Sequence, residues 1–308
     1  MIDTRILDPK ARRKIDTPKD ERIEFVQTDV FVPYAFSTYV LDTLEKLLKH
    51  PTADRMPCVL LTGRPGTGKS TLLKQFYARH PIDPNPRGHY AIAEVVYIQA
   101  RQNATETRFY RDVKALLNSR DIITRLNPEL EAKRQTDRLS ESGWELVKKV
   151  GLKMPLIDEI NNLVINVPKF EKPYPNTKFL SDMCFLHNEY KLAIVGAGIP
   201  KAKVVIEADE QLNSRFEDGY IDIPDWQYGQ DFVDFLAGLE QYLPFPEASH
   251  LYKKPLATTI HKLLAKKGQN PTTKDIRNLI KKAAVNAIER GGRKVTKDDI
   301  RAGMSAIV

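Results

Sequence analysis

Two patterns of apolar positions divide the chain near residue 225. Between residues 57 and 223, short apolar runs alternate with segments whose apolar residues recur every three to four positions. Such alternation predicts a parallel sheet with helices on both faces. The expected strands are 57–62, 94–99, 154–157, 191–196 and 220–223, and the expected helices are 34–49, 70–79, 108–117, 140–150 and 178–190.

Beyond residue 227 the strand-like runs stop and the helical period continues alone. Four helical blocks are expected, at 228–242, 255–267, 272–290 and 296–307, with Thr296 as the N-cap of the last. We therefore expect an α/β domain over 34–224 and a smaller all-helical lid domain over 225–308. Residues 1–33 are polar and charged without a sustained period, so we expect an N-terminal extension with limited structure of its own.

Composition and length exclude several protein classes. The chain has 308 residues, of which 42% are hydrophobic and 29% are charged, so it is neither a disulfide-stapled module nor a disordered protein. Its apolar runs are too short to cross a bilayer, and its amino terminus lacks the pattern of a secretory signal. The two cysteines, Cys58 and Cys184, favour buried reduced thiols. We predict a cytoplasmic protein that makes no membrane contact.

The positive charge is concentrated near the carboxyl end. The chain carries a net charge of +8, yet the segment Lys253–Lys297 holds thirteen Lys and Arg against two acids, a balance of +11 that leaves −3 elsewhere. Two interpretations stay open at this point. The segment is either a solvated helix face or a surface that contacts the phosphate backbone of a nucleic acid.

One segment carries a complete phosphate-binding motif. Residues 63–70 read Gly-Arg-Pro-Gly-Thr-Gly-Lys-Ser and match the P-loop pattern G-x-x-x-x-G-K-[ST] between an expected strand and an expected helix. Lys69 is expected to reach the β- and γ-phosphates of ATP, and the Ser70 hydroxyl is expected to bind Mg²⁺. The expected nucleotide-binding residues of this segment are Gly63, Arg64, Pro65, Gly66, Thr67, Gly68, Lys69, Ser70 and Thr71.

A second motif lies at the end of a later strand. The run Met154–Ile157 is followed directly by Asp158 and Glu159. Asp158 can hold Mg²⁺ through water, and Glu159 can orient or deprotonate the water that attacks the γ-phosphate. The pair therefore predicts an ATPase. Phosphotransfer to another substrate is less favoured, because nothing in the sequence suggests a pocket for an acceptor.

Two arginines complete the candidate site. Arg215 precedes the last expected strand, where an arginine can reach the γ-phosphate bound to a neighbouring subunit. Arg277 begins a helix of the basic segment and can fold over the nucleotide of its own chain. Taken singly, each position is more typical of a surface arginine.

In this order the motifs resemble an AAA+ ATPase of the initiator and clamp-loader group, over about residues 30–305. The finer resemblance is to the TniB/TnsC transposition regulators. The segments that carry it are Tyr34, 44–57, 156–163, 179–180, 195–198, 211–216, 243–244 and 283–285.

The resemblance implies a regulator that uses ATP and Mg²⁺ and assembles as a ring or helical filament on double-stranded DNA. Such a protein connects a TniQ-type target-selection adaptor, sometimes guided by a CRISPR effector, to a DDE transposase, and hydrolysis drives disassembly. Arg215 then acts in trans and Arg277 senses the nucleotide from the lid. DNA contacts are expected at Arg101, Arg111 and Lys114.

The sequence departs from the AAA+ pattern at one strand end and leaves alternatives open. Residues 196–198 are Gly-Ala-Gly where many AAA+ proteins place a polar sensor, so that role is unassigned and slow turnover is expected. The alternatives are a helicase loader or replication initiator, a scaffold that holds ATP with little turnover, and a monomeric nucleotide kinase.

Overall fold

The computed structural model describes residues 7–83, 92–100, 148–166, 174–175, 177–265 and 268–305. The chain divides into two compact units, each described by itself below. The sheet unit comprises Val40–Arg64 and Lys69–Ile223. The helical unit comprises Met1–Tyr39, Pro65–Gly68 and Pro224–Val308. Within the described ranges, no helix is both long and apolar enough to span a membrane.

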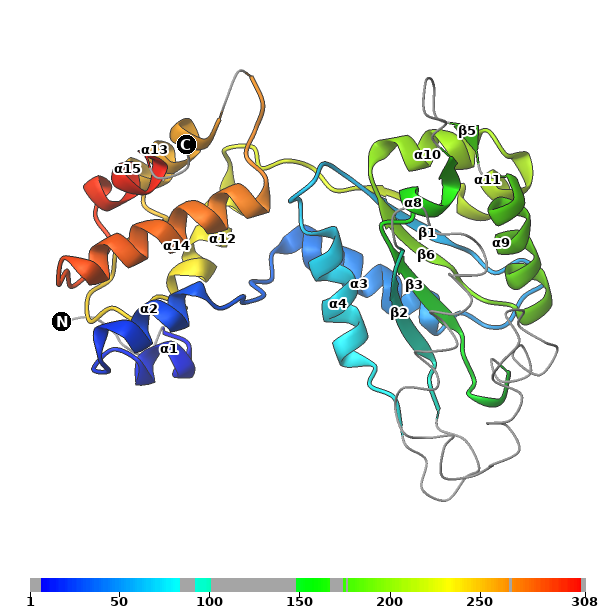
Figure 1. The fold of residues 1–308 in the computed structure, drawn as a ribbon, viewed down its shortest axis with the longest axis horizontal. Helices are drawn as coiled ribbons and strands as arrows, with labels where there is room; N and C mark the ends of the chain where they lie inside the picture. Colours follow the sequence, from blue (N-terminus) through cyan, green and yellow to red (C-terminus); the bar gives the residue numbers. More distant parts are fainter. Residues whose placement is uncertain are drawn as a thin grey trace. The chain divides into compact units, whose positions relative to one another are not determined.

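The sheet unit is built on five parallel strands (Figure 1). Their order across the sheet is β2-β3-β6-β1-β7. The strands are β1 (Val59–Thr62), β2 (Val95–Gln99), β3 (Met154–Asp158), β6 (Val195–Gly198) and β7 (Tyr220–Asp222). Every residue of β1, β3 and β6 is buried, as strands covered on both faces require. The parallel α/β sheet predicted from the sequence is confirmed.

Helices cover the two faces of this sheet (Figure 1). They are α3 (Ala35–Leu48), α4 (Lys69–Arg79), α8 (Asn161–Val164), α9 (Thr177–Tyr190), α10 (Pro200–Glu207) and α11 (Glu210–Phe216). Helix α4 packs against β2, β3 and β6, and α10 packs against β1. The short strands β4 (Ile165–Asn166) and β5 (Tyr174–Pro175) pair with each other.

The strand expected at 191–196 is wrong in its bounds, because β6 runs from Val195 to Gly198. Glycine is poor at forming strands, which hid the second half of β6 in the sequence. Its central place between β3 and β1 supplies pairing on both sides, and Gly198 aligns with Thr62 of β1. The expected helix at 108–117 and most of that at 140–150 lie outside the described residues.

The helical unit contains the four helices expected near the carboxyl end. They are α12 (Gln230–Glu240), α13 (Lys254–Leu264), α14 (Thr273–Glu289) and α15 (Lys297–Ser305). Each turns buried residues such as Phe235, Ile260 and Leu279 toward one shared core. An amphipathic helix buries its apolar stripe in this way.

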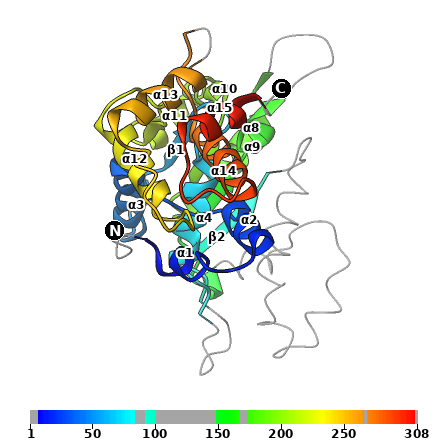
Figure 2. The same ribbon diagram turned by 90° about the vertical axis from the view of Figure 1, so that its left-hand side faces the viewer.

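The expectation that residues 1–33 have limited structure of their own is wrong. They form α1 (Pro9–Arg13) and α2 (Lys19–Gln27), and α2 lies beside α14 in both views (Figures 1 and 2). Val26 and Val32 enter the core of the helical unit, and Arg22 Nη2 donates to the Pro244 carbonyl at 2.8 Å. A few apolar side chains and distant hydrogen bonds fix this segment, and neither leaves a periodic pattern in the sequence.

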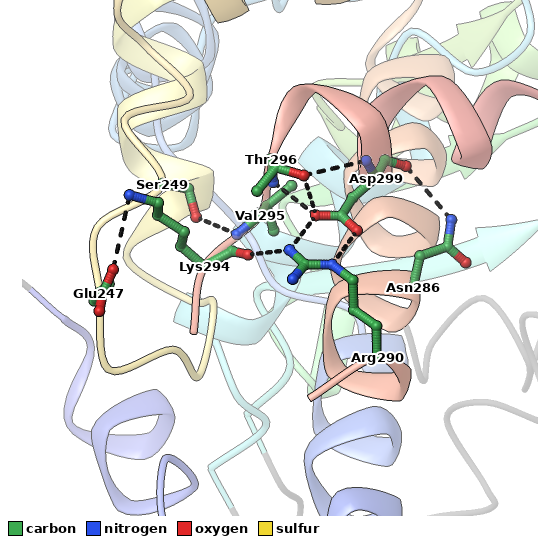
Figure 3. A network of polar contacts seen from close by, with 8 residues as sticks. All are labelled: Glu247, Ser249, Asn286, Arg290, Lys294, Val295, Thr296 and Asp299. Atoms are coloured by element: carbon green, nitrogen blue, oxygen red, sulfur yellow. Dashed lines mark hydrogen bonds and ion pairs between the residues drawn. The ribbon is translucent and has the colours of Figure 1, made fainter. Parts of the chain in front are cut away.

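Helix α15 starts at a buried polar network (Figure 3). Thr296 is its N-cap, as expected, and its hydroxyl and backbone N–H both donate to Asp299 Oδ2 at 2.7 Å. Arg290 adds Nε–Oδ1 and Nη2–Oδ2 bonds of 2.8 and 2.7 Å to the same carboxylate. Burial alone would raise the pKa of Asp299, but the hydrogen bonds from Arg290 and Thr296 lower it. The network therefore holds an ionised carboxylate inside the unit.

Candidate nucleotide-binding site

The P-loop leaves β1 at Thr62 and enters α4 at Lys69. Gly66 and Gly68 have φ angles of 88° and 105°, a left-handed backbone that a residue with a Cβ rarely adopts. These glycines let the chain reverse tightly between strand and helix. Ser70 and Thr71 follow in the first turn of α4.

Lys69 is buried with its charge held only by carbonyl oxygens. Its Nζ donates to the carbonyls of Gly63 and Arg64 at 2.7 and 2.9 Å, and among the described residues it forms no ion pair. Burial lowers the pKa of Lys69, and the nearby charges of Glu159 and Asp158 oppose this shift. A buried ammonium without a permanent counter-ion is costly unless an anion binds beside it.

Asp158 is the last residue of β3 and is almost fully buried. Both of its carboxylate oxygens accept hydrogen bonds, Oδ2 from the Tyr97 hydroxyl at 2.8 Å and Oδ1 from the Glu159 N–H at 3.0 Å. Burial and the hydrogen bond to Asp158 raise the pKa of Tyr97, so its hydroxyl stays a donor. The Asp158 side chain is therefore fixed in one orientation.

Glu159 follows with a φ of 55°. A left-handed backbone is uncommon for a residue with a side chain, and such positions cluster at functional sites. The chain turns at Glu159, and the next residue, Ile160, donates its backbone N–H to the Ala197 carbonyl of β6 at 2.9 Å. The acidic pair and β6 are thereby joined.

The carboxyl ends of β1, β3 and β6 lie at one edge of the sheet, which we call the carboxyl edge. Strand β6 lies between β3 and β1 in the sheet. The acidic pair, which follows β3, and the P-loop, which follows β1, therefore flank the carboxyl end of β6. Ligands bind at this edge in open α/β sheets. The structure thus brings Lys69 near Asp158 and Glu159, which lie far from it in the sequence.

Arg215 lies at the opposite end of β1. Its carbonyl accepts the N–H of Cys58, the residue before β1, whereas Lys69 follows the far end of that strand. From Cys58 to Thr62 the strand extends about 13 Å at the usual rise per residue. Its guanidinium donates to Asn188 Oδ1 at 2.9 Å and to the Gln211 carbonyl. Arg215 therefore does not join the P-loop of its own chain.

A buried histidine lies close to Arg215. His187 has no exposed surface, and its Nδ1 lies 3.2 Å from the Leu192 carbonyl and 3.6 Å from Cys58 Sγ. Burial and the positive charge of Arg215 lower the pKa of His187 to about 4. Cys58 and Cys184 are buried and form no disulfide, as expected.

The tip of the P-loop, residues 65–68, belongs to the helical unit. The Lys274 N–H donates to the Gly66 carbonyl at 2.9 Å, and Thr273 Oγ1 donates to the Thr67 carbonyl at 3.1 Å. Both residues lie in the first turn of α14. Arg277 follows in the next turn, where its Nη2 donates to Asp29 Oδ1 at 3.1 Å.

Sequence reasoning missed Tyr97 and Asn161 at the carboxyl edge. The pairing of β2 with β3 places Tyr97 beside Asp158, whereas Asn161 follows the acidic pair directly in the sequence and only the fold shows its contact with the end of β6. The Asn161 side chain accepts the Ile199 N–H at 3.3 Å. The expected DNA-contacting residues Arg101, Arg111 and Lys114 lie outside the described residues.

Comparison with known proteins identifies similar sequences and folds. The profile of the family described as "Bacterial TniB protein" matches residues 22–228. No curated protein matches the chain in sequence. Among solved structures, Cdc6p from Pyrobaculum aerophilum is similar with a TM-score of 0.61 and 17% identity, over 92% of this chain and 70% of that one.

Two further solved structures have the same fold. The ORC2 protein of Aeropyrum pernix, solved as ADPNP–ADP complexes, has a TM-score of 0.57 and 15% identity over 92% of this chain and 71% of that one. The ORC1 protein of the same organism, solved in complex with DNA, has a TM-score of 0.51 and 17% identity over 92% and 69%. These identities show a shared fold, and the parallel α/β sheet followed by a helical region that the sequence predicts is confirmed.

Proposed function

The chain belongs to the TniB family of bacterial proteins, and on that premise we propose that it is an AAA+ ATPase that regulates transposition. In this proposal, ATP bound between two copies of the chain holds them together on double-stranded DNA as a ring or helical filament. The assembly connects a TniQ-type adaptor to a DDE transposase.

The observation that carries the proposal is that buried Lys69, held only by carbonyls among the described residues, lies near two acids at the carboxyl edge. A buried ammonium that only carbonyls hold fits the β- and γ-phosphates of ATP. The hydroxyl of Ser70 and the carboxylate of Asp158 are the hard oxygen ligands that Mg²⁺ prefers. When bound, Mg²⁺ neutralises charge on the phosphates.

Four residues have separate roles in the hydrolysis step. Lys69 binds the terminal phosphates, while Tyr97 holds Asp158 in the orientation that a metal ligand needs. Glu159 orients the attacking water and accepts its proton as the bond to the γ-phosphate forms and the bond to the β-phosphate oxygen breaks.

Arg215 acts on the nucleotide of a neighbouring copy. Its place at the amino end of β1, with the P-loop at the carboxyl end, supports a role in trans and argues against one in cis. An arginine brought to the γ-phosphate from outside stabilises the charge of the transition state. Loss of the γ-phosphate removes this contact, which loosens the interface and releases the protein.

The proposed DNA contacts are Arg101, Arg111 and Lys114. Among the cations that the structure describes nearby, Lys153 pairs with Glu94 at 2.6 Å and Lys148 with Glu189 at 3.5 Å. Contacts to phosphates confer little sequence preference and a steep dependence on salt. Binding to duplexes of unrelated sequence at two salt concentrations tests this part of the proposal.

The lifetime of ATP-dependent assemblies on DNA tests the whole proposal. Electron microscopy of the protein with duplex DNA and a slowly hydrolysed ATP analogue is expected to show rings or helices. Glu159→Gln is expected to bind ATP but to dissociate from DNA more slowly than the wild type, because hydrolysis no longer removes the γ-phosphate. Assemblies no longer-lived than wild type would contradict the proposed cycle.

A second candidate is a scaffold that binds ATP and does not turn it over. The absence of a polar side chain in β6, where residues 196–198 are Gly-Ala-Gly, favours it. Single-turnover hydrolysis with protein in excess over ATP decides between the two. Phosphate release in one turnover supports the ATPase, and its absence supports the scaffold.

A further inference from the structure

The carboxyl end of β6 occupies a central position without a polar side chain of its own. β6 lies between β3, which ends in Asp158, and β1, which leads into the P-loop. A donor at the end of β6 would therefore stand between the acidic pair and the phosphate-binding loop. The residues of β6 itself are Val, Gly, Ala and Gly, and all of them are buried.

The space above these glycines is filled by the start of α8. A Cβ on Gly198 would stand 3.0 Å from Asn161 Oδ1 and 3.1 Å from Ile160 Cγ2. A Cβ on Gly196 would stand 2.7 Å from Ile160 Cδ1. The glycines thus allow Ile160 and Asn161 to approach the strand more closely than any other residue type would.

The carboxamide of Asn161 is held in a defined orientation over the strand end. The Ile199 N–H donates to it at 3.3 Å, and because that backbone group is a donor, the atom facing it is the oxygen Oδ1. The amide nitrogen carries two N–H donors. One of them bonds to Asn162 Oδ1 at 3.1 Å. Asn161 is only half-buried, so its amide is within reach of a ligand.

We propose that Asn161 supplies the polar contact that β6 lacks, by donating an amide N–H to the terminal phosphate of bound ATP. This assignment rests on the proposed function, since it concerns the same nucleotide. A donor at this point has a phosphate partner when the γ-phosphate is present and loses it in ADP. Asn161 therefore makes the site prefer ATP over ADP.

Equilibrium binding of a non-hydrolysable ATP analogue and of ADP, with Mg²⁺ and without DNA, tests the assignment. Asn161→Ala is expected to weaken binding of the analogue about tenfold, the effect of one hydrogen bond to a charged group, and to leave ADP binding unchanged. Gly198→Ala is expected to give a smaller loss of the same kind, because its Cβ displaces the carboxamide.

Asn161→Asp is the decisive variant, because it separates the structural role from the proposed one. Aspartate keeps an oxygen that accepts the Ile199 N–H, so α8 stays anchored, but it has no N–H donor. It is expected to lose at least as much affinity for the ATP analogue as Asn161→Ala. Thermal unfolding of each variant, without nucleotide, reports whether the fold is retained.

Four results would overturn the assignment. The first is a wild type that does not prefer the analogue over ADP, and the second is an Asn161→Asp variant that keeps the wild-type preference. The third is an Asn161→Ala variant that loses as much affinity for ADP as for the analogue, and the fourth is a loss of analogue affinity in Asn161→Asp alone, which would indicate charge repulsion. Failure of the wild type to assemble on DNA would instead contradict the proposed function, because the binding assay contains no DNA.

Discussion

The carboxyl edge of the sheet and the basic segment of the helical unit both depend on cations, but they use them in opposite ways. At the carboxyl edge, Lys69 is buried and bonds only to carbonyls. In the basic segment, several cations form ion pairs with carboxylates. Arg277 and Lys281, for example, both pair with Asp29. One region keeps a charge available for a ligand, and the other neutralises part of its charge within the fold.

The comparison shows why counting charge along the sequence misleads. The segment Lys253–Lys297 has a balance of +11, yet Asp29, which neutralises part of it, lies 248 residues before Arg277. Glu247, just outside the segment, pairs with both Arg293 and Lys294. Of the two interpretations left open by the sequence, these ion pairs favour the solvated surface for the part of the charge that they neutralise.

Replacing Lys69 is the largest expected perturbation and tests the first half of the comparison. Lys69→Ala is expected to lower the affinity for ATP on the order of 100-fold, because the phosphates lose a buried cationic donor. Its melting temperature without nucleotide is expected to stay close to that of the wild type, since an unpaired buried charge is removed.

Isothermal titration calorimetry measures the affinity, and differential scanning calorimetry measures the melting temperature. The matched control is Arg293→Ala, an exposed cation paired with Glu247, which is expected to bind ATP as the wild type does. Equal losses of ATP affinity in Lys69→Ala and Arg293→Ala would contradict the claim that the two regions use their cations differently.

Acidification is expected to destabilise the sheet unit before the helical unit. His187 has a pKa of about 4 in the folded chain and an ordinary value of 6.5 when unfolded. The unfolded state therefore binds the additional proton between these values, and stability is full above pH 6.5 and declines as pH falls to 4. The loss is on the order of 3 kcal/mol.

Amide hydrogen exchange of β1 and β6 between pH 7 and 4.5, corrected for intrinsic exchange rates, measures this loss. In His187→Gln, which has no titrating ring, the decline over this range is expected to disappear. If the free energy of opening of the sheet unit in the wild type is the same at pH 7 and pH 4.5, protonation of His187 does not destabilise the fold and the prediction is wrong.

The buried carboxylate of Asp299 provides the corresponding test in the helical unit. Asp299→Asn is expected to destabilise α15 by about 1–2 kcal/mol, because it weakens the N-terminal cap and the pair with Arg290. Since the folded pKa of Asp299 is below its ordinary value of 3.8, its stabilising effect is full above pH 3.8 and is lost as the pH falls further.

Its neighbour Asp298 is the matched control, because its side chain is 91% exposed and pairs with Arg301 at 3.8 Å. Asp298→Asn is expected to change stability by less than about 0.5 kcal/mol. Urea unfolding followed by hydrogen exchange in α15 compares the two variants, and equal effects would contradict a special role for the network in Figure 3.

The smallest expected effect is a change in the Mg²⁺ requirement. Tyr97→Phe removes the hydroxyl that orients Asp158, so the Mg²⁺ concentration for half-maximal ATP hydrolysis is expected to rise about tenfold or somewhat less. Nucleotide affinity without Mg²⁺ is expected to be unchanged. Tyr220→Phe, whose hydroxyl bonds to Asn213, serves as the control, and an equal rise there would contradict the role of Tyr97.

Local patterns predicted the parts of the molecule that local sequence determines. The P-loop between β1 and α4 and the acids after β3 were predicted because their residues are contiguous and their chemistry is specific. The four helices of the carboxyl end followed from their period, and the capping function of Thr296 followed from its residue type and position.

The remainder depends on contacts between distant segments. Residues 1–33 gave no periodic signal, since Val26 packs on a core made by α12–α15. The predicted bounds of β6 were too early in the chain, because the strand is determined by its pairing with β1 and β3 and its glycines give no strand signal. Tyr97 gave no signal either, because its hydroxyl reaches Asp158 only when β2 pairs with β3. Asn161 lies in a segment that carries the family resemblance, but its contact with the Ile199 N–H after β6 is visible only in the fold.

The central claim is that each ATP is completed by a neighbouring copy, and mixing two inactive variants tests it most directly. Lys69→Ala retains Arg215 but binds ATP far more weakly, and Arg215→Ala retains an intact P-loop but lacks the arginine. With duplex DNA present, we predict that neither variant hydrolyses ATP well alone and that an equimolar mixture recovers about a quarter of the wild-type rate, the fraction of interfaces with both parts intact. A mixture as inactive as its components, or an Arg215→Ala variant with full activity alone, would contradict the account.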